Sequence, residues 1–350
     1  HANMVSLARP FLADPNFVKK AIEGKSNEIN TCIACNQACL DHVFKRKVAS
    51  CLVNPLACHE TKILINKSHE VKKLAVVGAG PAGLSSAIKL KQLAKINNKE
   101  LSVCIVEKGP EVGAHILSGA VFETKALDEL FPNWKDMSHP TMSAITQEKF
   151  IFLTKNKSIR LPNFLLPKSM KNHNNFIISL ANMCRWLSEE AENLGVEIYP
   201  GFAAKEILFD EQDSVIGIAT GDMGVDKDFV KSSSFEPGIE LIGKYTLFAE
   251  GCRGHLGKQL IKKYNLDERK SPQSYGIGLK EIWEIDKENH KEGSVMHSAG
   301  WPLSNDIYGG SFLYHMDKNQ ISIGFVMGLD YKNPYISPYE EFQKFKTHPE

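Results

Sequence analysis

A glycine-rich turn between an apolar run and an amphipathic segment constrains the fold of this chain more than any other feature. Residues 72–95 read KKLAVVGAGPAGLSSAIKLKQLAK, which places Gly78, Gly80 and Gly83 in the spacing G-x-G-x-x-G directly after a predicted strand and before a predicted helix. In such a turn the first glycine permits the tight bend, the second lets a pyrophosphate approach the backbone, and the third lets helix and strand pack closely. Together with a second apolar strand at residues 101–108, the stretch predicts a β-α-β unit of a dinucleotide-binding α/β domain.

A carboxylate follows at the position where such domains bind ribose. Glu107 ends the second predicted strand, 24 residues after Gly83, and can accept a hydrogen bond from a ribose 2′-hydroxyl. A carboxylate there repels a 2′-phosphate, so the site favours FAD or NAD over NADP. The alternative is a turn that serves packing alone. The residues expected to hold the dinucleotide are Gly78, Ala79, Gly80, Pro81, Ala82, Gly83, Glu107 and Lys108.

A second glycine-rich turn follows another apolar strand. Residues 246–260 read TLFAEGCRGHLGKQL, and we expect Glu250 and Gly251 to form the second contact of an FAD domain. The alternative is an ordinary connection between a strand and a helix. The sequence has no second G-x-G-x-x-G turn, which argues against NAD(P)H as the electron source.

The remaining elements are predicted from periodicity and from breaker residues. The first segment is predicted to hold a short strand, a turn through Arg9-Pro10, and a helix opened by Asp14 as cap with Pro15 at its first position. Residues 176–201 predict a helix that ends at Gly195 and is followed by a strand, and residues 203–220 predict a hairpin.

Length and charge limit the kinds of partner. With 350 residues the chain has room for about two domains. The net charge of +1 argues against nucleic acid as a partner. No run of 18 apolar residues exists, so no transmembrane helix is predicted, and no signal peptide is seen. We expect the sequence to be cut at both ends.

Four cysteines near the start have the spacing of a metal centre. Cys32, Cys35, Cys39 and Cys51 form C-x2-C-x3-C-x11-C. Four thiolates suit a [4Fe-4S] cluster, which we favour, or a structural zinc, since both metals take tetrahedral sulfur ligands. Unliganded cysteines are the third possibility. Cys58 is expected to be a spare buried thiol.

The segment that carries these cysteines resembles the bacterial 2,4-dienoyl-CoA reductases and their trimethylamine dehydrogenase relatives. The similar stretches are MVSLARPFLADPNFVKKAIEG, EINTCIACNQACLDH and SCLVNPLACHE. The resemblance implies the end of a flavin-binding barrel followed by a loop in which the four cysteines hold a 4Fe-4S cluster. It also implies an arginine near an FMN phosphate at Arg9. Without the rest of the barrel, we expect Arg9 to be a surface or capping residue.

From about residue 76 onward the chain resembles the electron transfer flavoprotein-ubiquinone oxidoreductases. Matching stretches include CIVEKGPEVGAHILSGAV, FAEGCRGHLGKQL, GWPLSNDIYGGSFLYHM and GFVMGLDYKNPYISPYEEFQKFK, and the resemblance covers about 270 of the 350 residues. It implies an FAD protein that lies on one face of an energy-conserving membrane, takes electrons from electron transfer flavoprotein and reduces ubiquinone. The implied location is the cytoplasmic side of a bacterial inner membrane, or the mitochondrial inner membrane in a eukaryote.

The same resemblance implies two further sites. Gly309 and Gly310 match glycines whose backbone approaches the ubiquinone head group, and from the residues alone they would be a hairpin turn. Residues 112–122, VGAHILSGAVF, match a segment that enters the bilayer, and the alternative is an ordinary buried loop. No catalytic acid or base is implied, because the flavin carries the redox chemistry.

These observations predict a chain with two parts. Residues 1–66 would be a cysteine-rich segment from a barrel end, and residues 72–350 an FAD-binding Rossmann-like domain with an inserted α+β ubiquinone-binding domain whose C-terminal part is missing. The two resemblances meet at GAGPAG, residues 78–83, which both families share. Recombination, or an error in joining two similar genes, would leave such a join, and we favour the error. Two other functions stay open: an NAD(P)H-dependent flavin and iron-sulfur reductase of the dienoyl-CoA type, and an inactive flavin-binding remnant.

Overall fold

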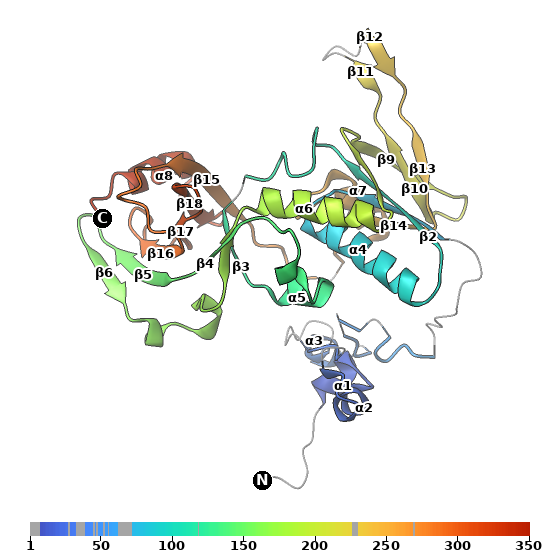
Figure 1. Ribbon diagram of the computed structural model, residues 1–350, viewed down its shortest axis with the longest axis horizontal. Helices are drawn as coiled ribbons and strands as arrows, with labels where there is room; N and C mark the ends of the chain where they lie inside the picture. The colour runs from blue at the N-terminus through green and yellow to red at the C-terminus, as the bar shows by residue number, and fades with distance from the viewer. Residues whose placement is uncertain are drawn as a thin grey trace. The chain divides into compact units, whose positions relative to one another are not determined.

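The computed structural model describes residues 8–26, 29–32, 39–44, 46, 48–51, 53–54, 56–61, 72–117, 119–225, 230–268 and 270–350. The chain divides into two compact units, His1–Glu70 and Val71–Glu350 (Figure 1). In the prediction from sequence, the first part ends at residue 66 and the second part begins at residue 72.

Among its described residues, the first unit has three short α-helices, α1 (Arg9–Ala13), α2 (Phe17–Ile22) and α3 (Leu40–Phe44). The predicted turn through Arg9-Pro10 is wrong, because α1 begins there and a proline is well suited to the first helical turn. The strand predicted before it lies in residues outside the described ones.

Asp14 is a structural residue of this unit and does not cap α2 as predicted. The cap position is Asn16, which makes no side-chain cap. Only 3% of Asp14 is exposed, and its carboxylate accepts hydrogen bonds from Lys20 Nζ at 2.7 Å and from the Asn30 backbone N–H at 2.9 Å. The bond from Lys20 is the main reason why the pKa of Asp14 lies below its usual value. The carboxylate therefore joins α2 to the segment around residue 30.

The second unit begins with the predicted β-α-β unit, which is confirmed. Strands β1 (Lys72–Val77) and β2 (Leu101–Glu107) are parallel and flank α4 (Pro81–Ile96) in the chain. Strands β8 (Glu197–Pro200) and β14 (Tyr245–Phe248) complete a parallel sheet in the order β14-β1-β2-β8. The domain is α/β, as the sequence predicts.

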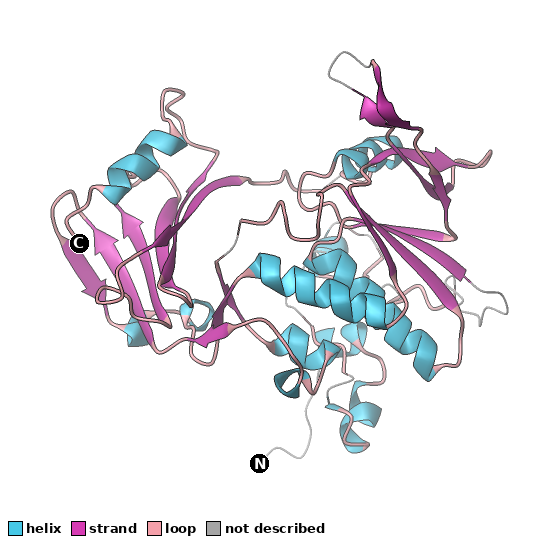
Figure 2. Ribbon diagram, turned by 45° about the horizontal axis from the view of Figure 1, so that its top comes forward, coloured by secondary structure: helices cyan, strands magenta, loops and turns pink. Residues whose placement is uncertain are grey.

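Both faces of this sheet are covered, which explains why its strands are nearly continuous apolar runs. On one face, α4 and α6 (Leu180–Asn193) bury a core that includes Leu84, Ile88 and Trp186. Helix α5 (Lys125–Leu130) contributes Leu127 to the same core. On the other face a second core is built around Val77, with side chains from α7 (His255–Tyr264). Figure 2 shows α4 and α6 lying side by side along the sheet.

An antiparallel sheet in the order β13-β10-β9 follows the parallel one. It consists of β9 (Ala204–Phe209), β10 (Val215–Thr220) and β13 (Glu240–Ile242), which confirms the predicted hairpin. Its extension, the ribbon of β11 (Met223–Val225) and β12 (Lys231–Glu236), projects away from the helices (Figure 1).

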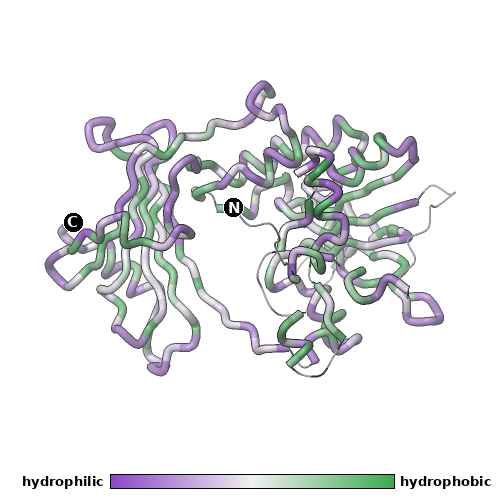
Figure 3. The backbone as a smooth tube through the Cα atoms, turned by 90° about the horizontal axis from the view of Figure 1, so that it is seen from below, coloured by the Kyte–Doolittle hydropathy of each residue, from purple (hydrophilic) through white to green (hydrophobic). Residues whose placement is uncertain are grey.

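The largest sheet of this unit has six strands, with α8 (Pro338–Lys346) packed on one face. The order is β15 (Gly276–Glu284), β18 (Gln320–Gly328), β17 (Gly309–His315), β16 (Ser294–Gly300), β5 (Gln147–Leu153), β6 (Ser158–Leu161). Phe342 and Phe345 of α8 pack with Phe325 of β18. Many of the loops that connect these strands are hydrophilic (Figure 3).

A small sheet and several 3₁₀ turns complete the second unit. The sheet has the order β3 (Ala120–Phe122), β7 (Phe176–Ile178), β4 (Met142–Ala144), and Ile177 of β7 packs with Val295 and Tyr314 of the six-stranded sheet. The 3₁₀ turns are η2 (Trp134–Asp136), η3 (Asn163–Leu165) and η4 (Lys168–Met170). In the part of the chain that the structure describes, no helix is both long and apolar enough to cross a membrane.

Candidate functional site

A groove of about 770 Å³ lies at the carboxyl ends of the parallel strands. Open α/β sheets bind their ligands at this end. The groove gathers residues from both glycine-rich turns, which are far apart in the sequence. Nine of the ten residues predicted to hold the dinucleotide line it, namely Gly78, Ala79, Gly80, Pro81, Ala82, Glu107, Lys108, Glu250 and Gly251.

The three glycines of the fingerprint differ in what surrounds them. Gly78 has φ +101°, and a Cβ there would lie 2.7 Å from the Ala249 carbonyl oxygen. A Cβ on Gly83 would collide with the Gly78 carbonyl oxygen, so Gly83, the tenth predicted residue, has a packing role below the groove. Around Gly80 a Cβ would meet nothing within 4 Å. The turn therefore leaves room for a ligand at Gly80, as a pyrophosphate site requires.

Two helix N-termini border the groove, and only one of them is filled by a side chain. The N-cap of α4 is Gly80, which has no side chain to cap the helix. At α7, the Glu250 carboxylate accepts hydrogen bonds from the Leu256 N–H at 3.2 Å and the Gly257 N–H at 2.8 Å. The α4 N-terminus is therefore the one suited to an anion, whereas the Glu250 side chain is committed to the protein's own backbone.

Glu107 lies where the ribose of a dinucleotide is expected, and it also ties the turn together. Its Oε2 accepts from the Ala79 N–H at 2.9 Å and its Oε1 from the Gly109 N–H at 2.8 Å. An ionised carboxylate has about four lone-pair sites, so both oxygens can still accept from a ligand hydroxyl. The shape of the groove, the open helix terminus and this carboxylate fit an FAD molecule.

Sequence reasoning missed three cationic or ionisable residues that line the same groove, His115, Arg253 and His255. The Arg253 guanidinium lies 5.2 Å from the centre of the Tyr275 ring. His255 Nδ1 is 3.3 Å from Glu250 Oε1. The available signal was the sequence EGCRGH, where two basic residues interrupt a glycine-rich turn.

A second groove, of about 540 Å³, contains both glycines assigned by resemblance to ubiquinone. Gly309 and Gly310 begin β17, so the alternative of a hairpin turn is wrong. A Cβ at Gly310 would collide with the Ser298 carbonyl oxygen of β16, so the glycine is also required for strand packing. Around them the groove is largely apolar, with Phe150 and Phe312 among its lining residues.

The segment 112–122 is mostly packed against the protein. Val112 belongs to the core beside α4 and α6, and residues 120–122 form β3. Of the large apolar side chains described in this segment, only Leu117 is strongly exposed, at 58%. These contacts favour the ordinary loop over a segment that enters a bilayer.

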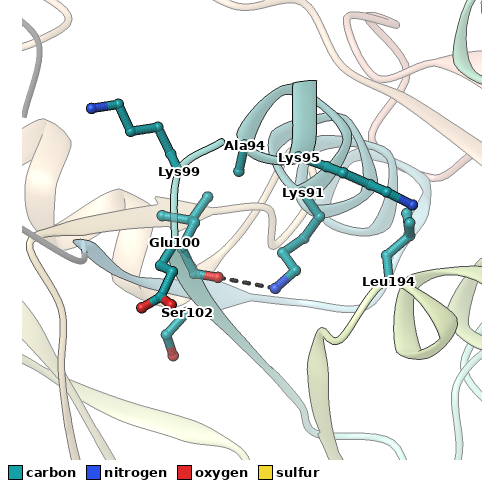
Figure 4. Close-up of a pocket in the computed structure, with 8 residues that line it drawn as sticks. Lys91, Ala94, Lys95, Lys99, Glu100, Ser102 and Leu194 are labelled. Carbon is teal, nitrogen blue, oxygen red and sulfur yellow. Dashed lines mark hydrogen bonds between the residues drawn. The ribbon is translucent and has the colours of Figure 1, made fainter. Parts of the chain in front are cut away.

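A third groove, of about 450 Å³, lies at the opposite end of β2 (Figure 4). Lys91, Lys95 and Lys99 line it, and Lys91 Nζ donates to the Leu101 carbonyl oxygen at 3.0 Å. Lysines near a helix C-terminus interact favourably with the helix dipole, so these side chains have a structural role at the end of α4. This groove contains none of the predicted site residues.

The four cysteines of the first unit are only partly described. Cys32, Cys39 and Cys51 are half-buried free thiols, and Cys35 lies outside the described residues. Thiols of this kind are suitable iron or zinc ligands. Among the described residues, however, no three Cys, His, Asp or Glu side chains come together as a metal site. The prediction that Cys58 is buried is wrong, because its thiol is exposed.

Comparisons with known proteins agree with the geometry of the second unit. The family described as "ETF-QO, ubiquinone-binding" matches residues 275–350, and "NAD(P)-binding Rossmann-like domain" matches residues 76–147. The chain is 57% identical over 278 residues to the electron transfer flavoprotein-ubiquinone oxidoreductase of Pseudomonas aeruginosa. Most of the chain is similar to this group of oxidoreductases. The alignment covers 79% of this chain and 50% of that protein, so the chain spans about half the length of this relative.

Relatives of somewhat lower identity carry the same name. The mitochondrial electron transfer flavoprotein-ubiquinone oxidoreductases of Dictyostelium discoideum and Homo sapiens are 54% and 51% identical, over 79% and 80% of this chain and 45% and 46% of theirs. Among solved structures, a geranylgeranyl bacteriochlorophyll reductase-like protein from Thermoplasma acidophilum matches with a TM-score of 0.55 at 14% identity, covering 80% of this chain and 62% of that chain. That likeness supports the fold alone.

Proposed function

We propose that this protein is a flavoprotein oxidoreductase that passes electrons from electron transfer flavoprotein, through FAD in the first groove, to ubiquinone in the second. The observation that carries the proposal is the gathering of nine predicted residues around one groove, while Gly309 and Gly310 line another in the region that matches the ubiquinone-binding family. The similarity to oxidoreductases named for both partners supports the same conclusion.

The residues of the first groove would bind FAD in distinct ways. The N–H groups at the start of α4 would hold the pyrophosphate, with Gly80 giving the backbone access to it. Glu107 would accept from the ribose, and Lys108 and Arg253 would supply positive potential. Gly251 would contribute backbone contact, because Glu250 is committed to α7. When bound, FAD supplies the redox chemistry.

The source of electrons tests this function. Under anaerobic conditions, reduced electron transfer flavoprotein is mixed with the FAD-loaded chain, and flavin absorbance is followed. We expect bleaching by this donor and none by NADPH. Bleaching by NADPH alone would favour a reductase of the dienoyl-CoA type. Flavin that binds but is bleached by neither would indicate a remnant without turnover.

We infer that the protein docks on a membrane surface through residues 149–171, a region that the sequence did not single out. Exposed apolar side chains gather there, at 78% for Phe164, 65% for Leu165 and 57% for Ile159. The region has six Lys or Arg and no Asp or Glu. Exposed apolar groups flanked by basic residues are typical of surfaces that bind anionic lipid. Met170 of this region also lines the second groove, so a membrane quinone could enter beside it.

Vesicle flotation tests the membrane surface. The double variant Phe164→Asp with Leu165→Asp should lose binding to vesicles containing phosphatidylglycerol. Ile96→Asp is the matched control, because Ile96 on α4 is equally exposed, at 75%, outside the region. Equal binding by the two variants would contradict this surface.

We propose that Cys32, Cys35, Cys39 and Cys51 take up a 4Fe-4S cluster. Their spacing supports it, and the three described thiols are free. No step of the proposed reaction is assigned to this cluster. Anaerobic reconstitution should give thiolate-to-iron absorbance and a signal on reduction. Uptake of one zinc ion without those bands would favour the zinc site.

We propose that the chain joins two sequences at residues 78–83, and that the join arose by an error between two similar genes. The change in resemblance on either side of a shared motif supports it. Amplification from genomic DNA, with primers in codons 30–50 and 150–170, should then fail consistently. A single product of the expected length would refute the error.

A further inference from the structure

The second groove contains an imidazole held between two aromatic rings. His297 lies in the middle of β16, opposite Phe150 of β5 on one side and Phe312 of β17 on the other. Residues opposite one another on adjacent strands share a face of the sheet. All three line the groove, so a flat ring that entered it would meet two aromatic side chains and one nitrogen heterocycle.

Next to this imidazole the wall of the groove is built from small residues. Ala299 follows His297 two positions along β16 and therefore lies on the same face. Gly310 lies two positions before Phe312 on β17. Both line the groove. They leave space beside the imidazole that larger side chains would occupy.

His297 is the one described lining residue whose side chain ordinarily titrates near neutral pH. The other titratable lining residue, Tyr308, is 82% exposed. A ligand that must take up a proton inside this apolar groove therefore has few other donors than His297.

Tyr314 positions the imidazole. Its hydroxyl lies 2.9 Å from His297 Nε2, and only 8% of the residue is exposed. Burial raises the pKa of Tyr314 to about 12, so the phenol keeps its proton. Because Nε2 is engaged with this hydroxyl, Nδ1 is the nitrogen left for a ligand.

Titratable groups around the imidazole come from three strands. Burial lowers the pKa of His297, and the Glu148 carboxylate of β5 opposes this effect. Tyr314 on β17 is neutral, and Lys280 of β15 lies beyond, 5.4 Å from the centre of the Phe312 ring. The free site therefore holds a neutral imidazole at pH 7, which a developing negative charge on a ligand oxygen would help to protonate.

We propose that His297 hydrogen-bonds a carbonyl oxygen of the quinone and delivers one of the two protons that quinone reduction consumes. This inference rests on the proposed function. Two electrons from the reduced flavin and two protons enter, both C=O bonds become C–O bonds, and two O–H bonds form. His297 takes a proton from solvent, passes it to one oxygen and returns to the neutral imidazole. The second oxygen takes its proton from water.

Binding is tested without turnover, by NMR of the aromatic ring signals, those of histidine and phenylalanine, in the chain titrated with the short-chain quinone ubiquinone-1. The His297 signal is the one missing in His297→Gln. We expect ubiquinone-1 to shift this signal while that of His290, outside the groove, stays in place. If quinone moves other signals of the groove but not His297, the inference is overturned while the quinone site stands. If no signal moves, the proposed quinone site fails, and the inference with it.

Kinetics then separate proton delivery from electron transfer. In the FAD-loaded, photoreduced protein, His297→Gln should slow flavin reoxidation by ubiquinone-1 about 100-fold, at the lower end of general-acid effects. Reoxidation by ferricenium, which takes up no proton, should be unchanged. The wild-type quinone rate should fall as pH rises through the His297 pKa, and the variant should lose this dependence.

Tyr314→Phe should shift that pH profile while keeping the dependence, because it removes the positioning bond and leaves the imidazole. His290→Gln is the control and should match the wild type with both acceptors. Equal loss with ubiquinone-1 and ferricenium in His297→Gln would overturn proton delivery and indicate a structural role. A wild-type quinone rate independent of pH would overturn it as well.

Discussion

The two ligand grooves of the second unit are built in different ways. The first is lined by two glycine-rich turns together with apolar and charged side chains, so a ligand meets backbone N–H groups, apolar walls and the Glu107 carboxylate. The second is made from side chains on neighbouring strands of one sheet, so what a ligand meets is aromatic rings and an imidazole. Substitutions at the glycines of the first groove should therefore act through steric fit, and those at the imidazole of the second through chemistry.

The largest effect is expected at Gly83, where the glycine-rich turn has no room for a side chain. Gly83→Val would drive a branched side chain into the Gly78 carbonyl oxygen. We expect the free energy of unfolding of the second unit to fall by about 3 kcal/mol, together with loss of FAD. Urea denaturation measures it. A variant as stable as the wild type would show that the turn relaxes easily.

Gly80→Ala separates ligand binding from folding, because the added methyl group reduces the room for a ligand and leaves the packing of the protein unchanged. A methyl group there meets nothing within 4 Å, and φ is −80°, which alanine adopts freely. Stability should stay within about 0.5 kcal/mol of the wild type, while FAD binding weakens about tenfold, or 1.4 kcal/mol. Calorimetric titration with FAD measures the affinity. Unchanged affinity would mean that no ligand approaches this glycine.

Gly310→Ala tests whether the second groove shares this sensitivity. The added methyl would meet the Ser298 carbonyl of β16, so we expect a loss of about 1 to 3 kcal/mol in the free energy of unfolding. Reduced quinone binding in this variant would therefore not by itself identify a quinone contact. Full stability combined with lost quinone binding would show that the glycine serves the ligand alone.

Glu107→Gln should act on the turn and on the ligand together. The amide has one acceptor oxygen, so it can accept only one of the two bonds that the Ala79 and Gly109 N–H groups donate to the two carboxylate oxygens. A charged hydrogen bond to ribose would be lost as well. FAD binding should weaken by about 1 to 3 kcal/mol. Recovery of the wild-type protein with NADP and no flavin would contradict the assignment of this carboxylate.

The smallest effect concerns the first unit and pH. Because the folded-state pKa of Asp14 lies below its ordinary value of 3.8, its stabilisation is fully present above pH 3.8 and is lost as pH falls through the lower, folded value. Asp14→Asn should remove this dependence. Chemical denaturation between pH 2 and pH 6 measures it, and identical acid sensitivity in the variant would contradict the role of Asp14.

The sequence predicted the first groove far better than the second. A short local pattern was enough for Gly78, Gly80 and Glu107, because the β-α-β unit fixes their relative positions within about 30 residues. His297, Phe150 and Phe312 come together only through sheet pairing between distant segments, and no local pattern encodes a register of that kind. The role of Glu250 was missed for a related reason, since a carboxylate before a glycine-rich turn can face a ligand or cap the next helix.

The errors near the start have a local cause. The pair Arg9-Pro10 predicts a turn, but a proline also fits the first turn of a helix, and here a helix begins. The membrane-binding surface proposed at residues 149–171 was not predicted, because apolar residues interspersed with basic residues are common in any exposed segment. The exposure of its apolar side chains, which only the structure shows, distinguishes this region from ordinary loops.

Reoxidation of the photoreduced, FAD-loaded protein by ubiquinone-1 tests the central claim most directly. The account predicts that the oxidised flavin spectrum returns and that one quinol forms for each flavin. A flavin that ferricenium reoxidises, but that stays reduced in the presence of ubiquinone-1, would contradict it.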